Sequence, residues 1–178
     1  MNTFFGTKQI KATAMTRLEY NEYRGWNLPD EEDGTDTGYL VEYIDGGASN
    51  NDRHKGYISW SPSAVFDRAY QPDTALSFGH AILAMKLGYK VARAGWNGKG
   101  MWVALTPGSL FEAKHAKDGH AAKHRAVEVD EINNSNPDGL IQIRLLPHID
   151  MRAADGSMVV GWLASQTDML ADDWQVVP

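Results

Sequence analysis

A glycine-rich turn flanked by tryptophans constrains the fold of this chain more than any other stretch. The turn Asn97-Gly98-Lys99-Gly100 lies between two segments of strand character, within the run from Ala92 to Trp102. Such a turn holds its flanking strands at a fixed spacing, and its glycines let backbone N–H groups approach a ligand closely. The pattern predicts a β-hairpin with strands at residues 89–96 and 101–106.

The side chains around this turn allow two interpretations. Trp96 provides a ring, Arg93 and Lys99 provide cations, and the glycines leave amides exposed. Stacking rings, fixed cations and exposed amides are the groups that bind a nucleotide-like ligand. The alternative is a plain hairpin with one ring packed inward and one lying along the surface. Composition alone favours the plain hairpin, because a short motif is only a hypothesis without its context.

Short strands are predicted for much of the remaining chain. Alternating apolar and polar residues bounded by glycine, asparagine, aspartate or proline are typical of strands. They are expected at residues 7–14, 38–44 and 57–60, at 140–152 with a break at Pro147, at 158–163 after a turn at Asp155-Gly156, and in a short segment that closes the chain.

Local capping signals predict three short helices and one helical turn. A serine or threonine before a helix accepts a hydrogen bond from a free backbone N–H, and glycine after the last residue ends a helix. With the strands, these elements predict an α+β fold of short, mainly antiparallel strands. The helices are expected at residues 16–24 with Thr16 and Glu19 as a capping box, from the N-cap Ser61 and Pro62 to Tyr70, from Ser77 to Gly88, and as one turn within 164–174.

The stretch Gln71-Pro72-Asp73-Thr74 is the predicted domain boundary. It separates a small N-terminal accessory module, residues 1–72, from a second domain, residues 73–178. That second domain contains a long polar insertion at residues 108–138. A span of this length without firm structure is unusual inside a compact domain and indicates a functional or mobile loop.

Charge and composition exclude several classes of function. The formal net charge of −6 disfavours broad attraction to DNA, RNA or an anionic membrane. No apolar run of membrane length and no secretory leader is visible. The absence of cysteine excludes disulfides, thiolate catalysis and cysteine-based zinc sites, and is compatible with the cytoplasm.

No motif names an enzyme, a metal site or a cofactor. His115, His120 and His124 invite a metal interpretation, but neighbouring lysines disfavour a cation and no carboxylate pairs with them at ligand spacing. A solvated basic loop is the favoured interpretation, and such a loop could also neutralise phosphate. The adjacent Asp172 and Asp173 point in different directions along a strand or helix, which weakens them as a shared-proton pair.

Six tryptophans are many for this length, and most are expected in the core. Two of them have unusually polar neighbours. Trp96 precedes Asn97 and Lys99, while Trp162 precedes Ser165, Gln166 and Asp168. Stacking of a base on such a ring is worth about 1–3 kcal/mol. For these two tryptophans together, ligand contact and core packing are both retained as interpretations.

Two long motifs and two shorter ones resemble a phage family. The motifs are Phe78 to Gly88 followed by Lys90 to Met101, then Pro147 to Met151, Ala154-Asp155-Gly156, and Trp162 to Trp174. Over residues 76–178 they resemble the phage Thoeris anti-defence family, second type. The N-terminal part, including Arg24-Gly25-Trp26, Gly38 to Tyr43 and Gly56 to Pro62, is similar to a module that accompanies this domain in some phage and prophage proteins.

The resemblance implies a sponge rather than an enzyme. Members of the family bind the cyclic ADP-ribose isomers made by bacterial TIR-domain sensors, and so deprive the NADase effector of its signal. They form homotetramers with pockets between protomers, and some hold cyclic dinucleotides at a separate site. By motif, Trp96, Asn97, Trp162 and Asp168 are expected to line the cyclic nucleotide pocket, with Arg93, Lys99, Ser165 and Gln166 as further candidates.

Two departures from the compact family form leave the preferred ligand open. They are the N-terminal module and the basic insertion at residues 108–138. The expected setting is the bacterial host cytoplasm during infection, with no cofactor and no metal. Two alternatives remain, namely a hydrolase that degrades such signals and a module that binds a host protein through its acidic loop at residues 29–36.

Overall fold

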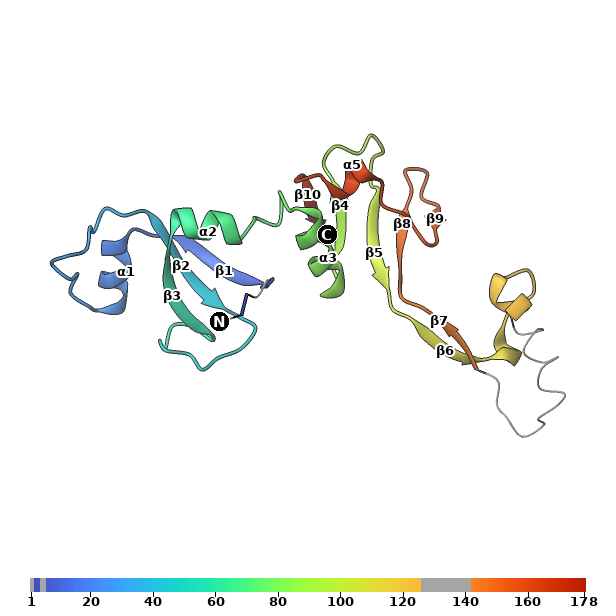
Figure 1. Ribbon diagram of the computed structural model, residues 1–178, viewed down its shortest axis with the longest axis horizontal. Coiled ribbons are helices and arrows are strands. Elements are labelled where there is room, and N and C mark those ends of the chain that lie inside the picture. Colours follow the sequence, from blue (N-terminus) through green and yellow to red (C-terminus); the bar gives the residue numbers. More distant parts are fainter. Residues whose placement is uncertain (1, 4–5, 126–141) are drawn as a thin grey trace. The chain divides into compact units, whose positions relative to one another are not determined.

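The computed structural model describes residues 2–3, 6–125 and 142–178, and the chain forms two compact units (Figure 1). The units are residues Met1–Ala75 and Leu76–Pro178. The fold is α+β with short, mainly antiparallel strands, as predicted. None of the described helices is long and apolar enough to cross a membrane. Residues 126–138 of the predicted insertion and residues 140–141 of a predicted strand lie outside the described ranges.

The N-terminal unit is a three-stranded antiparallel sheet with two helices. The capping box predicted for its first helix is present, because the Thr16 hydroxyl accepts from the Glu19 N–H and the Glu19 carboxylate accepts from the Thr16 N–H. Tyr20, Leu40 and Ile58 form its buried core. The strands are β1 (Ile10–Ala14), β2 (Gly38–Tyr43) and β3 (Tyr57–Pro62) in the order β1-β2-β3, and the helices are α1 (Arg17–Arg24) and α2 (Ser63–Ala69).

The start of α2 differs from the prediction. Ser61 is not its N-cap but the strand partner of Tyr39 in the ladder between β2 and β3. Pro62 is the N-cap and makes no side-chain capping bond. The ladder continues past Ser61 because β2 extends to Gly38, and the first helical N–H, from Ser63, donates to the main-chain oxygen of residue 37 over 3.0 Å.

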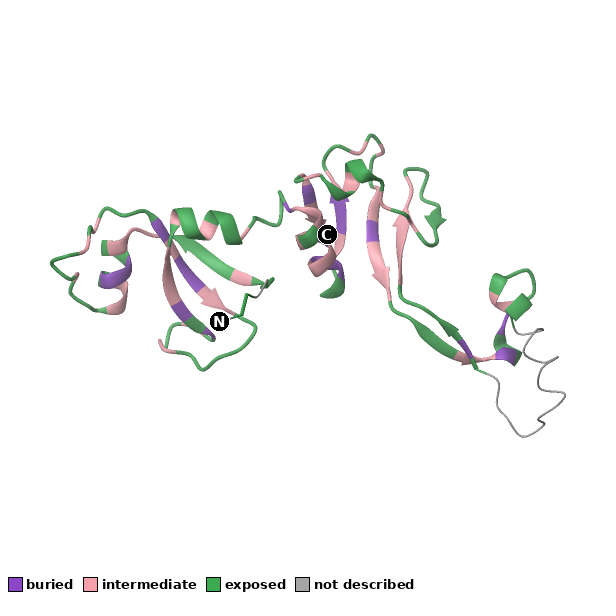
Figure 2. Ribbon diagram, viewed as in Figure 1, coloured by how far each residue is buried: buried purple, intermediate pink, exposed green. Residues whose placement is uncertain are grey.

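The C-terminal unit is built on a five-stranded antiparallel sheet covered by one helix. The helix α3 (Phe78–Lys86) starts at Ser77, whose hydroxyl accepts from the His80 N–H, and Gly88 follows it with a φ of +92°. Buried residues of α3, β4 and β5 form the core, which is purple in Figure 2. The sheet order is β10 (Trp174–Val177), β4 (Lys90–Arg93), β5 (Trp102–Thr106), β8 (His148–Arg152) and β9 (Met158–Val159).

The predicted hairpin has a much wider connection than a four-residue turn. Strand β4 ends at Arg93 and β5 begins at Trp102, so residues 94–101 form the connection. The strand stops early because Ala94 N–H donates to the Asp173 carbonyl over 3.0 Å and Gly95 N–H to the Asp173 carboxylate over 2.8 Å. The chain is thereby drawn toward β10 instead of continuing along β5.

Strand β9 is also shorter than the predicted segment 158–163. Gly161 has a φ of +76°, which ends the extended conformation. Its N–H donates to the Asp150 carboxylate over 3.0 Å, and the Trp162 N–H donates to the Ile149 carbonyl over 2.7 Å. Residues 160–163 therefore cross back toward β8 rather than extending the sheet.

The insertion is partly structured, contrary to the expectation of a loop without firm structure. Its first segment forms β6 (Ser109–Glu112), which pairs with β7 (Gln142–Leu145) in a two-stranded antiparallel ribbon. A short 3-10 helix, η1 (Ala113–His115), follows β6. Ile143 is buried against Ala113 and Ala116, so the ribbon has a small core of its own.

The tryptophans are less buried than expected. Only Trp174 is fully buried, at 0% exposure, and Trp26 is 53% exposed. The other four are intermediate, namely Trp60, Trp96, Trp102 and Trp162. In the core of the C-terminal unit, Trp174 of the edge strand β10 packs with Val91, Val103 and the buried residues of α3.

Candidate functional site

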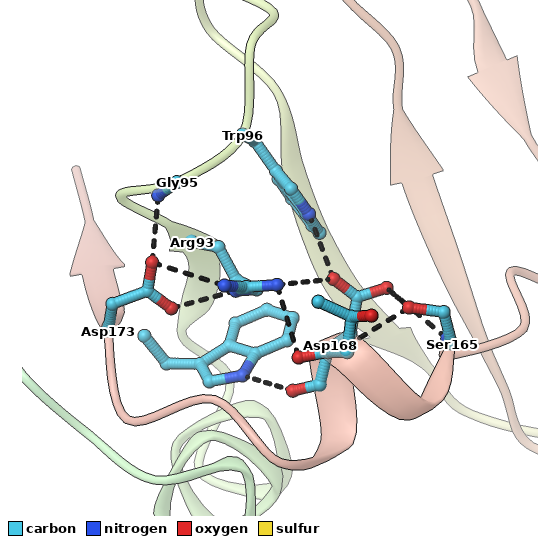
Figure 3. Close-up of polar contacts among 8 residues, drawn as sticks. Arg93, Gly95, Trp96, Ser165, Asp168 and Asp173 are labelled. Atoms are coloured by element: carbon cyan, nitrogen blue, oxygen red, sulfur yellow. Dashed lines mark hydrogen bonds and ion pairs between the residues drawn. The ribbon is translucent and has the colours of Figure 1, made fainter.

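The candidate site lies where the connection 94–101 meets the closing segment of the C-terminal unit (Figure 3). The closing segment, residues 162–173, contains a short helix, α5 (Gln166–Met169), and leads into β10. Ser165 caps α5 as part of a capping box, since its hydroxyl oxygen accepts from the Asp168 N–H over 3.1 Å. The Ser165 N–H and hydroxyl in turn donate to Asp168 Oδ2 over 3.2 and 2.7 Å. The cap thus fixes one oxygen of Asp168.

The other oxygen of Asp168 joins the closing segment to the connection. Asp168 Oδ1 accepts from Arg93 Nη1 over 3.0 Å and from Trp96 Nε1 over 3.1 Å. The main-chain oxygen of Asp168 accepts from the Trp174 indole over 2.9 Å. The carboxylate is only 14% exposed. Asp168 therefore links α5 to Arg93 and Trp96, more than seventy positions earlier in the chain, and to Trp174 in β10.

Arg93, the last residue of β4, is fully engaged within the protein. Its Nε donates to Asp173 Oδ1 over 2.7 Å and its Nη2 to Asp173 Oδ2 over 3.3 Å. Its Nη1 donates to Asp168 and to the Thr167 carbonyl, over 3.0 and 3.2 Å. Such two-point arginine–carboxylate pairs fix geometry as well as charge. Two carboxylates thus contact the one guanidinium, so the negative charges outnumber the positive charge by one.

The titration of these groups follows from their contacts. Burial raises the pKa of Asp168, but hydrogen bonds from Ser165, Arg93 and Trp96 outweigh it and leave the pKa below its usual value. The Arg93 hydrogen bonds lower the pKa of Asp173, against a smaller effect of burial. The Asp173 hydrogen bonds raise the pKa of Arg93. At neutral pH all three groups are charged.

Three tryptophans of this site pack edge to face against one another. Trp96 and Trp162 have ring centroids 6.1 Å apart at 73°, and Trp96 and Trp174 are 5.4 Å apart at 77°. Trp162 and Trp174 are 6.2 Å apart at 75°. Such T-shaped pairs are a favoured aromatic geometry. Trp174 is buried, while Trp96 and Trp162 each keep part of their surface exposed.

The structure divides the eight predicted site residues into two groups. Arg93, Trp96, Ser165 and Asp168 are joined by hydrogen bonds, and Trp162 reaches them through its ring contact with Trp96. Asn97, Lys99 and Gln166 are exposed, and their side chains have no hydrogen bond or ion pair to any residue in the described ranges. The first group forms a hydrogen-bonded frame, and the second adds unpaired polar side chains on the same two segments.

Sequence reasoning missed three members of the frame. Asp173 supplies the two-point partner of Arg93, Gly95 donates its N–H to the same carboxylate, and Trp174 is the central ring. A Cβ on Gly95 would lie 3.0 Å from Asp173 Oδ2, so glycine permits this close approach. Only the strand pairing of Arg93 with Trp174, which the sequence does not reveal, identifies this group.

The groups left unpaired at this surface are suited to binding a ligand. Within residues 2–3, 6–125 and 142–178, no group of three or more histidine, aspartate or glutamate side chains could hold a metal ion. The two carboxylates near the tryptophans already accept from Arg93. Trp96 and Trp162 keep part of their rings exposed, and the exposed residues Asn97, Lys99 and Gln166 belong to the same two segments.

Two comparisons with known proteins cover this site. The model of the Tad2-like family, described as the Thoeris anti-defense 2-like domain, matches residues 76–177. A protein of Bacillus phage SP01 named Thoeris anti-defense 2 is 33% identical to this chain over 104 residues. That similarity spans 58% of this chain and 97% of the phage protein. The family match contains both the connection 94–101 and the closing segment, and it begins where the N-terminal unit ends.

Proposed function

The chain belongs to the Thoeris anti-defense 2-like family through residues 76–177, and on that premise we propose that it sequesters a cyclic nucleotide immune signal without cleaving it. The family supports an anti-defence role for a phage protein. The proposed ligand class is the cyclic ADP-ribose isomers. The proposed setting is the cytoplasm of the infected bacterium, where such a signal would be made.

The proposal rests on two partly exposed tryptophan rings, Trp96 and Trp162, and on unpaired polar side chains in the same segments. Trp96 and Trp162 offer faces on which a base can stack, and stacking of this kind tolerates many bases. Asn97 and Gln166 offer both donors and acceptors for sugar hydroxyls and base edges. The frame beneath is held by hydrogen bonds, so little ordering is needed when a ligand binds. Tryptophan rings held in place, with hydrogen-bonding side chains in the same segments, suit the binding of a nucleotide.

The two candidate cations have different proposed roles. Lys99 is exposed and has no carboxylate partner among the described residues, so it can neutralise a phosphate. Arg93 already faces Asp168 and Asp173. We therefore assign Lys99 to the ligand and Arg93 to positioning Trp96 and Asp168. A phosphate placed directly on Arg93 would face two carboxylates, which disfavours it.

Absence of cleavage is supported by the state of the carboxylates. Lowered pKa values keep Asp168 and Asp173 ionised at neutral pH, so neither is suited to act as a general acid. As bases they are also poorly placed, because their oxygens already accept hydrogen bonds from Arg93 and its neighbours. The Ser165 hydroxyl donates to Asp168 and caps α5, rather than being free for attack.

Exposed apolar side chains near the site support assembly with further copies of the chain. Val160 is 74% exposed, Leu163 is 90% exposed and Leu170 is 82% exposed. All three flank Trp162 or α5 in the closing segment. A patch of this kind marks an interaction surface more often than a free one. A homotetramer, in which a partner completes the ligand pocket, is the proposed assembly, and the mass in solution by light scattering tests it.

Ligand recovery tests the proposed function. The full chain is incubated with cyclic ADP-ribose isomers, separated from free ligand, and heat-denatured, and the released nucleotide is identified by mass spectrometry. Intact ligand in stoichiometric amount is expected. Recovery of a cleaved product would instead establish a hydrolase, and no bound nucleotide would leave the host-protein alternative.

A double variant and a control variant test whether the ligand binds at this surface. Asn97→Ala with Lys99→Gln should weaken binding at least tenfold without lowering the melting temperature, because both side chains are exposed and unpaired among the described residues. Lys86→Gln is the charge-matched control, since Lys86 is exposed in the last turn of α3. Equal binding by the double variant and the wild type would show that the ligand binds elsewhere on the protein.

A further inference from the structure

The N-terminal unit contains a cavity of its own, which the family match does not include. It lies where β2 and β3 are joined and has a volume of about 540 Å³. Pockets of 300–1,000 Å³ are typical for small ligands. Its wall includes cationic, glycine and aromatic residues, among them Lys11, Tyr43, Gly46, Gly47, Arg53 and Lys55.

The cavity wall is cationic in a chain that is acidic as a whole. Lys11, Arg53 and Lys55 line it, whereas the chain carries a net charge of −6. In the described part of the chain, no carboxylate forms an ion pair with any of these three side chains. Cations that line one cavity without a carboxylate ion pair repel one another, and a bound anion relieves that repulsion. The charge at this wall therefore favours a negatively charged occupant.

Glu42, the acidic residue of the lining, offsets one of these three positive charges, so the wall keeps a net positive charge. Hydrogen bonds hold its carboxylate in place. Glu42 Oε2 pairs with His54 Nδ1 over 3.1 Å, and Glu42 Oε1 accepts from the backbone N–H groups of Lys55 and Gly56 over 3.1 Å each. The hydroxyl of Tyr23 lies 2.7 Å from the other ring nitrogen of His54. This chain of hydrogen bonds makes Glu42 and His54 a fixed wall of the cavity.

The cation Arg53 is held in a defined position. Its guanidinium lies 3.7 Å from the centroid of the Tyr23 ring, and its Nε donates to Asn51 Oδ1 over 3.3 Å. It also donates to the Tyr23 carbonyl. A planar guanidinium fixed by stacking loses little freedom when it binds a phosphate oxygen. Neutral acceptors hold this arginine in place, so its charge stays uncompensated.

Two glycines on the wall leave the backbone open to a ligand. Gly46 and Gly47 have φ values of +145° and +92°. Space next to Gly46 is open, with no atom within 4 Å of the position a Cβ would take. Glycine-rich turns with exposed N–H groups are favourable surroundings for phosphate. The neighbouring Asp45 pairs with Lys8 over 3.8 Å.

We propose that this cavity binds a phosphate-bearing small molecule of nucleotide size. Lys11, Lys55 and Arg53 receive the phosphate, together with the backbone at Gly46 and Gly47. The ring of Tyr43, which also lines the cavity, contacts the less polar part of the ligand. This second site is independent of the cyclic nucleotide site proposed for the C-terminal unit, because it shares no residue with it.

Calorimetric titration of the full chain tests this site, with ADP and inorganic pyrophosphate as probes at low ionic strength. Lys11→Gln with Lys55→Gln should weaken ADP binding at least tenfold. Lys86→Gln with Lys117→Gln removes the same charge from exposed positions of the C-terminal unit and should leave binding unchanged. No heat with either probe, or equal weakening by both pairs, would overturn the proposal.

Two further measurements keep the test independent of folding and of the other site. Lys11→Arg with Lys55→Arg preserves the charge and should retain ADP binding within a few-fold. Amide resonances of Gly46 and Gly47 should shift on adding pyrophosphate, whereas Asn97→Ala with Lys99→Gln should not alter ADP affinity. Loss of ADP binding in that last variant would assign the probe to the C-terminal unit and reject the second site.

Discussion

Arg93 is held by both carboxylate oxygens of Asp173, through Nε over 2.7 Å and Nη2 over 3.3 Å. This pair joins the last residue of β4 to the residue that precedes β10. The same guanidinium also reaches Asp168 in α5. Together with the bonds from Gly95 and Trp96 to the same two carboxylates, this arginine holds the connection 94–101 to the segment between Trp162 and β10.

Replacing Arg93 with lysine tests whether this arginine is a structural clamp. Lysine keeps the charge but cannot contact two carboxylates through a planar fork. Loss of hydrogen bonds to charged groups should lower the free energy of unfolding by about 1–3 kcal/mol. Urea denaturation measures this change. Lys99→Ala, at an exposed position of the same surface, should shift it by no more than about 0.5 kcal/mol.

One result would contradict the interpretation of Arg93 as a structural clamp. If Arg93→Lys keeps the stability of the wild type but abolishes nucleotide binding, Arg93 contacts the ligand directly. Its two carboxylate partners would then have to release it when the ligand binds.

Acid should destabilise the C-terminal unit through Asp168 and Asp173. Both have a pKa below the usual value in the folded chain, while an unfolded aspartate titrates near about 3.9. Their stabilising contribution is therefore complete above about pH 4 and is lost as the pH falls through the lowered pKa values. Melting temperatures measured between pH 7 and 3 should fall most steeply below about pH 4.

A matched pair of variants separates this effect from general acid unfolding. Asp173→Asn removes one of the two carboxylates and should flatten the acid limb of the curve. Asp172→Asn, at the exposed neighbouring position, should leave the limb as in the wild type. Parallel curves for all three proteins would show that Asp173 contributes no pH-dependent stability.

Removing the cap of α5 should loosen the closing segment. Ser165→Ala deletes the hydroxyl that accepts from the Asp168 N–H and donates to its carboxylate. The expected loss of stability is about 1 kcal/mol, as for other N-cap serines. Ser165→Thr should restore most of it. Thermal unfolding provides the measurement, and a silent alanine variant would show that α5 does not need the cap.

Local signals in the sequence predicted local structure well. The box of Thr16 and Glu19 and the cap at Ser77 depend on contacts between residues three apart, so the sequence alone reveals them. The predictions failed where a distant partner decides. Ser61 stays in a strand because Tyr39 pairs with it, and β4 stops because Asp173 takes the next two backbone N–H groups.

The candidate site shows the same limit. Motif resemblance selected Trp96 and Trp162, whose rings the structure brings into contact. It could not separate the two cations, because the partners of Arg93 lie more than seventy positions along the chain. In the sequence Asp173 is one of two adjacent aspartates, and nothing local marks it as the two-point partner of Arg93. Long-range charge pairing leaves no periodic signal in a single sequence.

Trp96 both supports the frame and offers a ring to the ligand, and two substitutions separate these roles. Trp96→Phe keeps an aromatic face but removes the Nε1–H donor to Asp168. It should cost about 0.5–1.5 kcal/mol of stability and leave nucleotide affinity within a few-fold. Trp96→Ala removes the ring as well and should weaken nucleotide binding by a further amount of about 1–3 kcal/mol.

Both variants are compared by calorimetric titration with a cyclic ADP-ribose isomer, after circular dichroism has shown that each is folded. Asp168→Asn weakens the same hydrogen bond from the other side, together with those from Arg93 and Ser165, and leaves the ring in place. A phenylalanine variant that binds as poorly as the alanine variant would mean that the indole N–H, and not the ring face, meets the ligand. Asp168 would then compete with the ligand for that donor, and Asp168→Asn should tighten binding.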